Sequence, residues 1–476
     1  MTDRTNRKIL LIAPENTFGI GFARIPNLGM GYAAAAARAA GFGFDWLDAA
    51  EKPFSSGDVL RQVQNASPPY TAIGLNVFTA SLSPSRNLAA QLGKIPGIPP
   101  LILGGPHPTF EPEETFSEIP AARFLFLGEC EEGLGPLLDL LAGSLEPSEP
   151  ELAKIPNLCW RAPDGTIRKN PRSFVADLDR IGMLPWDRIR PDRYPLAPNG
   201  IFSRRNRIAP MIATRGCPYT CTFCGAPNSM GKKIRTRSPE HMIEEIRWLQ
   251  RDFGIHEIHF MDDNFTLDRR FLRAFCEAVL RAGLRFDWAC PNGVRLDSLT
   301  EETLPLMERA GCYSFAVGIE SGSQRVLDLI EKKLTLEEIE EKVALVRRLT
   351  DIRMTGFFVI GLPGETEAEV NQTIDFARRL PIHRANFFNY SPFPGSPIYD
   401  RLKADGRLDG LDLSSLYIHR VQYASDELGH DRLKRLQRKA YVSFYARPGV
   451  LWGIAREIRS FSQVATIGRR VGLLAG

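Results

Sequence analysis

The sequence lacks the apolar segments that are typical of transmembrane helices and of secretory leaders. It has no stretch of about eighteen uncharged apolar residues, so no transmembrane helix is predicted. Residues 1–14, MTDRTNRKILLIAP, lack the apolar segment and cleavage site of a secretory leader. We therefore expect a cytoplasmic protein, in which thiols stay reduced and clustered cysteines serve as metal ligands rather than as disulfide partners.

An excess of charge of one sign is also absent. The net charge of +4 is small for 476 residues, and a nucleic-acid-binding protein would show a concentrated basic face. The composition, 43% hydrophobic and 24% charged, is that of an ordinary globular protein. A chain of this length is expected to form about two to four domains.

The first 143 residues alternate between short apolar runs and helical patterns. Runs typical of buried parallel strands lie at 7–14, 43–49, 70–78, 99–109 and 122–133. Helical patterns lie at 29–42, 85–95 and 132–143. The alternation predicts a flavodoxin- or Rossmann-like α/β domain over 1–143, with ligands beyond the carboxyl ends of the strands. No G-x-G-x-x-G follows the first strand, so a dinucleotide site is not expected.

The rest of the chain divides into three regions. Residues 144–206, rich in proline and charge, are predicted to be a linker with a small hairpin whose turn is Asp164-Gly165. Over 207–425 six strand–helix steps predict a (β/α)6 partial TIM barrel, with its chemistry at the carboxyl ends of the strands. Residues 426–476 are helical and basic, either a terminal cap or an amphipathic surface for an anionic membrane or substrate.

Three cysteines follow the first barrel strand: Cys217, Cys221 and Cys224, in a C-x3-C-x2-C pattern. Three thiolates can hold a cubane iron–sulfur cluster and leave one iron open, and an open position marks a catalytic metal. The alternatives are a zinc site completed by a distant residue and a cluster closed by a fourth cysteine. The spacing does not match the common zinc patterns. The remaining cysteines lie in predicted helices and strands or outside the barrel: Cys130, Cys159, Cys276, Cys290 and Cys312.

The segment RGCPYTCTFC, residues 215–224, resembles the signature of radical S-adenosylmethionine (SAM) enzymes, and the resemblance extends over roughly 208–400. It implies a 4Fe-4S cluster whose open iron is chelated by SAM. One electron then cleaves SAM to a 5′-deoxyadenosyl radical, while the protein binds, orients and excludes solvent. Phe223 occupies the position whose backbone lies near the adenine in that family.

The same resemblance implies further SAM-binding residues at strand ends. Asp262, Asp263 and Asn264 would face the SAM amino group, although Asn264 or Thr266 is equally typical of a helix N-cap.

Two later strands end in further candidates. Glu320 would contact the ribose or amino group, the alternative being a surface cap, and Arg295 could pair with the SAM carboxylate. Gly361 and Pro363 would let the backbone pass close to the adenine.

The N-terminal region resembles the cobalamin-binding domain that precedes the barrel in one large subgroup of these enzymes. The resemblance lies in residues 25–49, in LGGPHPTFEPEE and in FLGECEEGL. It implies cobalamin contacts from Gly104, Gly105, His107, Gly128 and Glu129. The D-x-H-x-x-G motif is absent, and His107 is also typical of a hydrogen-bonded loop histidine, so the cobalt is expected to lack a protein imidazole ligand.

The two resemblances together imply a cobalamin-dependent radical SAM enzyme. The leading hypothesis is methylation of an unactivated carbon, or of phosphorus, in a small-molecule substrate. The alternatives are ring closure or oxidation without methyl transfer, methylthio transfer, and a cobalamin or redox sensor. The expected partners are an electron donor such as flavodoxin or ferredoxin and, through the basic C-terminal helices, a membrane surface.

Overall fold

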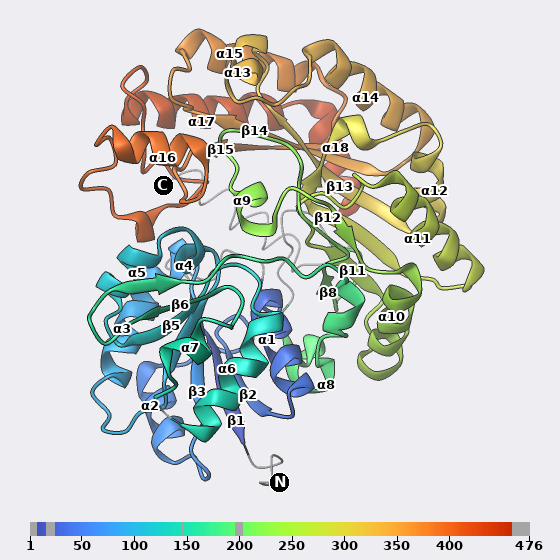
Figure 1. Ribbon diagram of the computed structural model, residues 1–476. Coiled ribbons are helices and arrows are strands. Elements are labelled where there is room, and N and C mark those ends of the chain that lie inside the picture. The colour runs from blue at the N-terminus through green and yellow to red at the C-terminus, as the bar shows by residue number, and fades with distance from the viewer. Residues whose placement is uncertain (1–6, 16–23, 145, 196–202, 459–476) are drawn as a thin grey trace. The chain divides into compact units, whose positions relative to one another are not determined.

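The computed structural model describes residues 7–15, 24–144, 146–195 and 203–458, which form two compact units. The described part of the first unit is residues 7–15, 24–144, 146–195 and 228–231. The second unit comprises the described residues of 203–227 and 232–458. Each unit is built on its own sheet (Figure 1).

The first unit contains a seven-stranded sheet in the order β2-β1-β3-β4-β5-β6-β7. Strands β1 to β5 are parallel, and their order 2-1-3-4-5 is that of flavodoxin-like folds. This confirms the predicted fold class. The five strands are β1 (Lys8–Ala13), β2 (Gly43–Asp48), β3 (Ala72–Asn76), β4 (Leu101–Gly104) and β5 (Ala122–Phe126).

Helices cover both faces of this sheet. On one face α1 (Leu28–Ala39) packs beside α6 (Glu131–Gly143), and the small side chains of Ala34 and Ala37 are fully buried there. The other face buries side chains of α2 (Ser56–Gln64) and α3 (Leu82–Leu92). Both faces of the parallel strands are therefore apolar, as expected for strands with continuous hydrophobic runs. Shorter helices are α4 (Pro106–Phe110), α5 (Pro112–Glu118), α7 (Glu149–Leu152) and α8 (Trp186–Ile189).

The hairpin expected within 144–206 is present, and it belongs to the sheet. Strand β6 (Leu158–Arg161) pairs antiparallel with β5, and β7 (Ile167–Lys169) pairs antiparallel with β6. Gly165 has a φ of +82°, which the tight turn between the two strands requires. Trp160 is buried in the core on the α1–α6 face, so side-chain burial as well as backbone pairing holds the hairpin to the sheet.

The second unit contains six parallel strands in the order β8-β11-β12-β13-β14-β15. The first and last strands are not paired with each other, so the described sheet is an open barrel, which confirms the predicted (β/α)6 arrangement. The strands are β8 (Ala209–Met211), β11 (Glu257–Phe260), β12 (Asp287–Val294), β13 (Cys312–Glu320), β14 (Arg353–Ile360) and β15 (Arg384–Asn389).

Helices surround this sheet on its outer side (Figure 1). The long ones are α10 (Pro239–Phe253), α11 (Arg269–Arg281), α14 (Leu336–Leu349) and α15 (Glu367–Arg379). The short ones are α12 (Thr303–Arg309), α13 (Gln324–Leu329) and α16 (Pro397–Ala404). Helix α9 (Ala226–Met230) is not part of this outer layer, and its residues 228–230 belong to the first unit. A small ribbon, β9 (Thr214–Arg215) with β10 (Arg235–Thr236), flanks the loop that follows β8.

The packing between strands and helices is largely aromatic. Phe260 of β11 stacks on Phe265 at 4.3 Å between ring centroids, and Phe275 and Trp288 meet Phe260 edge-on at 5.5 Å each. All four side chains are essentially inaccessible to solvent. This cluster fixes α11 against the strand whose end carries Asp262, and so contributes to holding that strand end in place.

The helix that follows this strand end does not begin where the sequence suggested. The N-cap of α11 is Asp268, whose carboxylate accepts from the backbone N–H groups of Arg270 and Phe271. The alternative that Asn264 or Thr266 caps the helix was therefore wrong. Both side chains are buried instead, since the chain makes one further turn before the helix starts.

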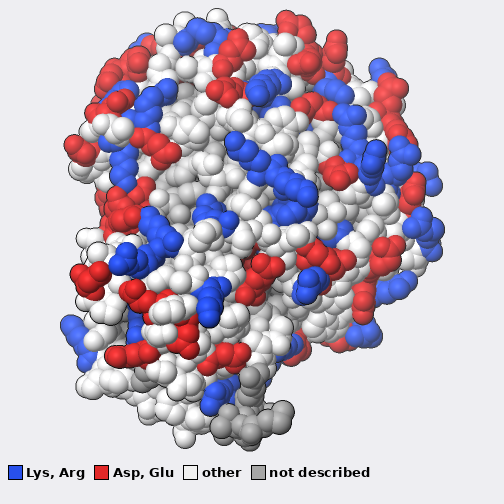
Figure 2. All heavy atoms as spheres, viewed as in Figure 1, with Lys and Arg blue, Asp and Glu red and all other residues white. Residues whose placement is uncertain are grey.

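The C-terminal helices are α17 (His430–Tyr445) and α18 (Pro448–Glu457), and residues 459–476 of the predicted basic region lie outside the described residues. Cations of α17 contact α15: Arg432 pairs with Glu367, and Lys439 donates to Asn371 at 2.6 Å. Among the helices of the described ranges, none is long and apolar enough to cross a membrane. Cationic and anionic side chains are intermixed over the face shown in Figure 2.

Candidate functional site

The three cysteines of the C-x3-C-x2-C pattern lie on the loop between β8 and α9. Cys221 is buried and the other two are half-buried, and none of the three is in a disulfide. The loop is fixed through Thr222, whose N–H donates to the carbonyl of Ile330 at 3.0 Å and whose carbonyl accepts from the N–H of Ile398 at 2.9 Å. Segments far apart in sequence therefore hold the loop at the carboxyl edge of the sheet.

Asp262, at the end of β11, anchors the chain just before this loop. Its buried carboxylate accepts from the backbone N–H groups of Ala213, at 3.1 Å, and of Thr214. Burial raises the pKa of Asp262 to about 7, against the hydrogen bonds that favour its charged form. The carboxylate thus contacts backbone, and its predicted contact with the SAM amino group stays a prediction.

Asp263 and Asn264, unlike Asp262, each have polar atoms that a ligand could contact. The Asp263 side chain is exposed, and its negative charge adds to the rise that burial causes in the pKa of Cys224. Asn264 is buried, and its Oδ1 accepts weakly from the Arg295 N–H at 3.5 Å. Its Nδ2 has no hydrogen-bond partner among the described residues, so it can donate to a ligand. Both residues therefore remain candidates for SAM contacts.

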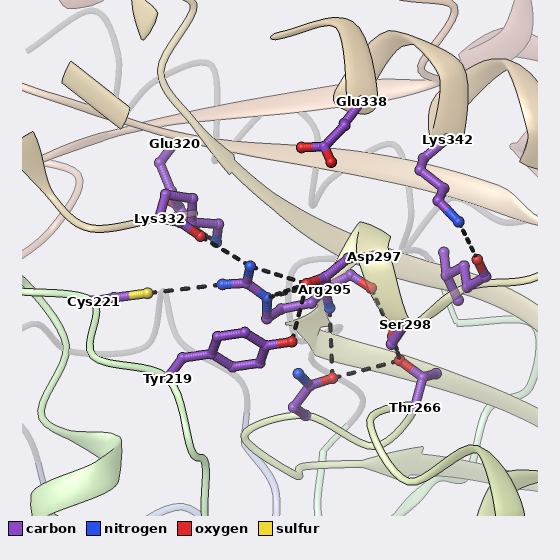
Figure 3. Close-up of polar contacts among 12 residues, drawn as sticks. Tyr219, Cys221, Thr266, Arg295, Asp297, Ser298, Glu320, Lys332, Glu338 and Lys342 are labelled. Atoms are coloured by element: carbon purple, nitrogen blue, oxygen red, sulfur yellow. Dashed lines mark hydrogen bonds and ion pairs between the residues drawn. The ribbon is translucent and has the colours of Figure 1, made fainter. Parts of the chain in front are cut away.

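Arg295, which follows β12, is bound on several sides (Figure 3). Its Nε donates to Asp297 at 3.0 Å, and its Nη2 donates to the carbonyl of Lys332 at 2.9 Å. The guanidinium lies 3.6 Å from the centre of the Tyr219 ring, and Nη1 points at the sulfur of Cys221, 3.9 Å away. The predicted pairing of Arg295 with the SAM carboxylate stays a prediction.

Glu320 ends β13 and forms a buried ion pair with Lys332, at 2.7 Å. It is therefore not a surface cap, and Ser323 caps the helix that follows. Glu320 has a φ of +69°, and Glu331 and Lys333 are also left-handed. Such conformations are rare outside glycine and cluster at functional sites, because the surrounding structure must compensate for their cost.

The loop after β14 is shaped by packing and by a buried carboxylate. Gly361 has a φ of +81°, and a Cβ there would lie 2.6 Å from Leu433 of α17. Glu365 accepts from the N–H groups of Gly361 and Leu362, and burial raises its pKa to about 8. The conformation of the loop that contains Pro363 is therefore fixed. Phe223 packs against the apolar cluster to which Leu362 of this loop also belongs.

The donor set of the cysteine loop suits an iron–sulfur cluster. Burial raises the pKa of all three thiols, to about 12 for Cys224, and a bound metal would offset that cost by holding them as thiolates. Within the described ranges no three His, Cys, Asp or Glu side chains are arranged around a single metal ion. A cubane needs a wider arrangement, because each of its irons takes a different thiolate.

The carboxyl edge of the first sheet has space for a ligand beside strand β4. A Cβ added to Gly104, the last residue of β4, would meet no atom within 4 Å, so there is space beside this strand end. At Gly105 the φ is +110° and a Cβ would lie 2.7 Å from the carbonyl oxygen of Val77. The first glycine leaves room for a ligand, whereas the second is required by the backbone itself.

His107 lies in the first turn of α4 rather than in an open loop, and it is buried. Its Nδ1 is 3.3 Å from the Thr79 hydroxyl, which agrees with the alternative that His107 is a hydrogen-bonded histidine. Sequence reasoning missed Thr109, which accepts from the Gly128 N–H at 2.9 Å and donates to the Gly105 carbonyl at 2.8 Å. Thr109 thereby ties together the loops after β4 and β5.

Glu129 forms hydrogen bonds with two later segments of the first unit. Its Oε2 accepts from the Val175 N–H at 2.6 Å, and its carbonyl accepts from the Asn157 amide. Sequence reasoning also missed Asp48 at the end of β2, which accepts from the Tyr194 hydroxyl at 2.8 Å. Because Asp48 is the last residue of its strand, its position in the sequence could have marked it as a polar residue at the carboxyl edge of the sheet.

Comparison with known proteins identifies a family for one segment in each unit of the chain. Residues 211–377 match the radical SAM superfamily, and residues 23–138 match the B12 binding domain. The chain is a radical SAM enzyme with an N-terminal B12-binding domain. The first match contains strands β11 to β14 of the open barrel, and the second contains strands β2 to β5 of the first sheet.

Relatives of this radical SAM enzyme include methyltransferases. An uncharacterized methyltransferase from Pyrococcus horikoshii is 29% identical and matches 93% of this chain and 94% of its own length. Cytidylyl-2-hydroxyethylphosphonate methyltransferase from Streptomyces wedmorensis is 27% identical, covering 85% and 83% of the two chains. The structure of TsrM, a radical SAM methyltransferase from Kitasatospora setae, superposes with a TM-score of 0.71 at 17% identity, over 93% and 90% of the chains, which shows a common fold.

The buried Asp262 carboxyl of this radical SAM enzyme should make its stability depend on pH. Its folded pKa, about 7, lies above the ordinary value of 3.8, so the folded state keeps a proton that the unfolded state loses between these values. The free energy of unfolding therefore loses this contribution as pH rises through that window. Asp262→Asn should gain stability relative to the parent between about pH 4.5 and 6.5, measured by urea unfolding followed by tryptophan fluorescence. A pH-independent difference between the two proteins would contradict this assignment.

Proposed function

We propose that this enzyme transfers a methyl group from SAM to an unactivated carbon, or to phosphorus, of a small-molecule substrate with the help of cobalamin. The observation that best supports the proposal is the loop of Cys217, Cys221 and Cys224, held at the carboxyl edge of the barrel in a chain that also has a B12-binding domain. A fourth cysteine in that loop would close the cluster, and the loop has none.

In this proposal Cys217, Cys221 and Cys224 would hold a 4Fe-4S cluster through three of its irons and leave the fourth iron open for SAM. A cluster bound there would supply the electron that cleaves SAM. The chain keeps the loop rigid through Asp262 and through the backbone bonds of Thr222. Rigidity matters because a radical must form close to the hydrogen that it abstracts.

The SAM contacts are assigned to side chains at neighbouring strand ends. The exposed carboxylate of Asp263 is suited to the SAM amino group, and Nδ2 of Asn264 can donate to the SAM carboxylate. Glu320, fixed by Lys332, is placed for the ribose. Phe223 and the Gly361–Pro363 turn are assigned to the adenine.

The cobalamin site is assigned to the carboxyl edge of the first sheet. Gly104 leaves space there, and Gly105 and Gly128 give the two loops the conformations that border it. Cobalamin bound there would supply the cobalt that carries the methyl group. His107, buried against Thr79, lines this edge and is not assigned as a cobalt ligand. Glu129 acts indirectly, by fixing the loop after β5 to the Val175 N–H.

The main test uses SAM with a labelled methyl group, a strong reductant and candidate substrates. We expect 5′-deoxyadenosine to form and the label to appear in the product, measured by mass spectrometry. Cys221→Ala should abolish both, whereas Cys276→Ala, which truncates a buried thiol of α11, should retain them. Formation of 5′-deoxyadenosine without label in the product would favour ring closure or oxidation, and a cluster spectrum unchanged by SAM would favour a sensor.

The cobalamin assignment is tested at Gly104. A Cβ there would meet no atom of the described residues within 4 Å, so the fold should tolerate a valine whose side chain takes the space of the ligand. Gly104→Val should weaken hydroxocobalamin binding about tenfold or more, measured by equilibrium dialysis. Gly143→Val, at an equally open position at the end of α6, should bind like the parent. Equal weakening by both substitutions would argue against the assignment.

An external one-electron donor, such as flavodoxin or ferredoxin, is part of the same proposal, because each cleavage of SAM consumes an electron. We place the enzyme in the cytoplasm, in peripheral contact with a membrane. The support for that contact is the exposure of Val442, Leu451 and Trp452, with Arg456 stacked on Trp452 at 4.7 Å. Apolar side chains beside cations are typical of helices that lie on anionic bilayers.

The membrane contact predicts vesicle binding. Replacing Leu451 and Trp452 by serine should reduce co-sedimentation with phosphatidylserine vesicles at least about fivefold, since two apolar anchors are lost. Phe78→Ser, which removes an exposed ring of the first unit, serves as the control and should bind like the parent. If the parent protein does not co-sediment, the membrane contact is wrong.

A further inference from the structure

Arg295 is held in one orientation by contacts on three sides. Asp297 accepts from Nε and Nη2, at 3.0 and 3.1 Å, and the Lys332 carbonyl accepts from Nη2 at 2.9 Å. The Tyr219 ring lies under the guanidinium plane, and its hydroxyl donates to Asp297 at 3.0 Å. Arg295 is only 6% exposed, so these contacts replace water almost completely.

The remaining guanidinium nitrogen, Nη1, is directed at the sulfur of Cys221, 3.9 Å away, as Figure 3 shows. Tyr219 and Cys221 belong to the same loop, so the ring that orients the guanidinium moves with the sulfur that the guanidinium faces. The contacts of the other thiols differ in kind. Cys224 accepts from the backbone N–H of Ala226 at 3.4 Å, which brings a dipole but not a full charge.

The position of this cation has a consequence for any cluster bound there. Reduction adds negative charge to the cluster and its thiolates, and a nearby cation or N–H donor stabilises the reduced form. In a site shielded from water the effect is larger than at the surface. Asp297 lies on the opposite side of the guanidinium from the sulfur and offsets part of the positive charge.

We propose that Arg295 is a positioning residue that, through its contact with the Cys221 thiolate, raises the reduction potential of the cluster. The inference rests on the proposed function, because it requires the cluster to be bound by the three cysteines. It assigns the guanidinium to the protein side of the cluster.

The test is a redox titration of the reconstituted full-length protein without SAM, followed by electron paramagnetic resonance. In Arg295→Gln the ratio of reduced to oxidised cluster at a fixed ambient potential should fall about tenfold, which is 59 mV for a one-electron couple. Arg295→Lys keeps the charge and should show a smaller fall. Asp297→Asn removes the offsetting charge and should shift the ratio in the opposite direction.

The matched control is Arg384→Gln. Arg384 is also a buried arginine paired with a carboxylate, that of Glu457, but it lies at the amino end of β15, at the opposite edge of the sheet from the cysteine loop. Its replacement should leave the potential unchanged. Opposite shifts for Arg295→Gln and Asp297→Asn separate an electrostatic role from a general disturbance of the site.

The possible failures are distinguishable because iron and sulfide are measured first. If the parent protein assembles no cluster, the proposed function fails. If Arg295→Gln holds a full cluster with an unchanged potential, or if it shifts in the same direction as Asp297→Asn, this inference fails and the proposed function stands. If Arg295→Gln holds no cluster, Arg295→Lys and Asp297→Asn decide the question by the same criteria.

Discussion

The parallel direction of the strands is the constraint on which both candidate sites depend. In the second unit it brings Cys221, Asp262, Arg295 and Glu320, which follow or end four different strands, to the same edge of the sheet. In the first unit it does the same for Gly104 and for the loop that begins at Gly128. The candidate binding groups are thus brought together by the fold and not by proximity in the sequence.

Charges gathered at such an edge must be compensated, because they are partly removed from water. Arg295 is paired with Asp297, Lys332 with Glu320, and Asp262 with two backbone N–H groups. Each pairing also removes rotational freedom from a side chain. A site built this way has its dipoles and charges oriented before any ligand arrives, which is the arrangement that favours catalysis.

Much of this architecture could be predicted from the sequence. The alternation of apolar strands and amphipathic helices predicted both sheets, and the spacing of Cys217, Cys221 and Cys224 identified the loop. The contacts that give individual residues their roles could not be predicted. Arg295 and Cys221 are 74 positions apart, and their approach depends on how a loop packs against the end of another strand. The left-handed turns that place Lys332 against Glu320 have no residue typical of them, because Glu331 and Lys333 are not glycine.

The hairpin of β6 and β7 also has a consequence for how the first unit can be isolated. Strand β5 forms backbone hydrogen bonds with β4 on one side and with β6 on the other. A fragment that stopped after α6 would leave the β6-facing side of β5 with unpaired N–H and carbonyl groups, and exposed strands of that kind pair with neighbouring molecules. Expression of the cobalamin-binding half alone therefore calls for a fragment that extends to Pro195, so that this flank stays covered.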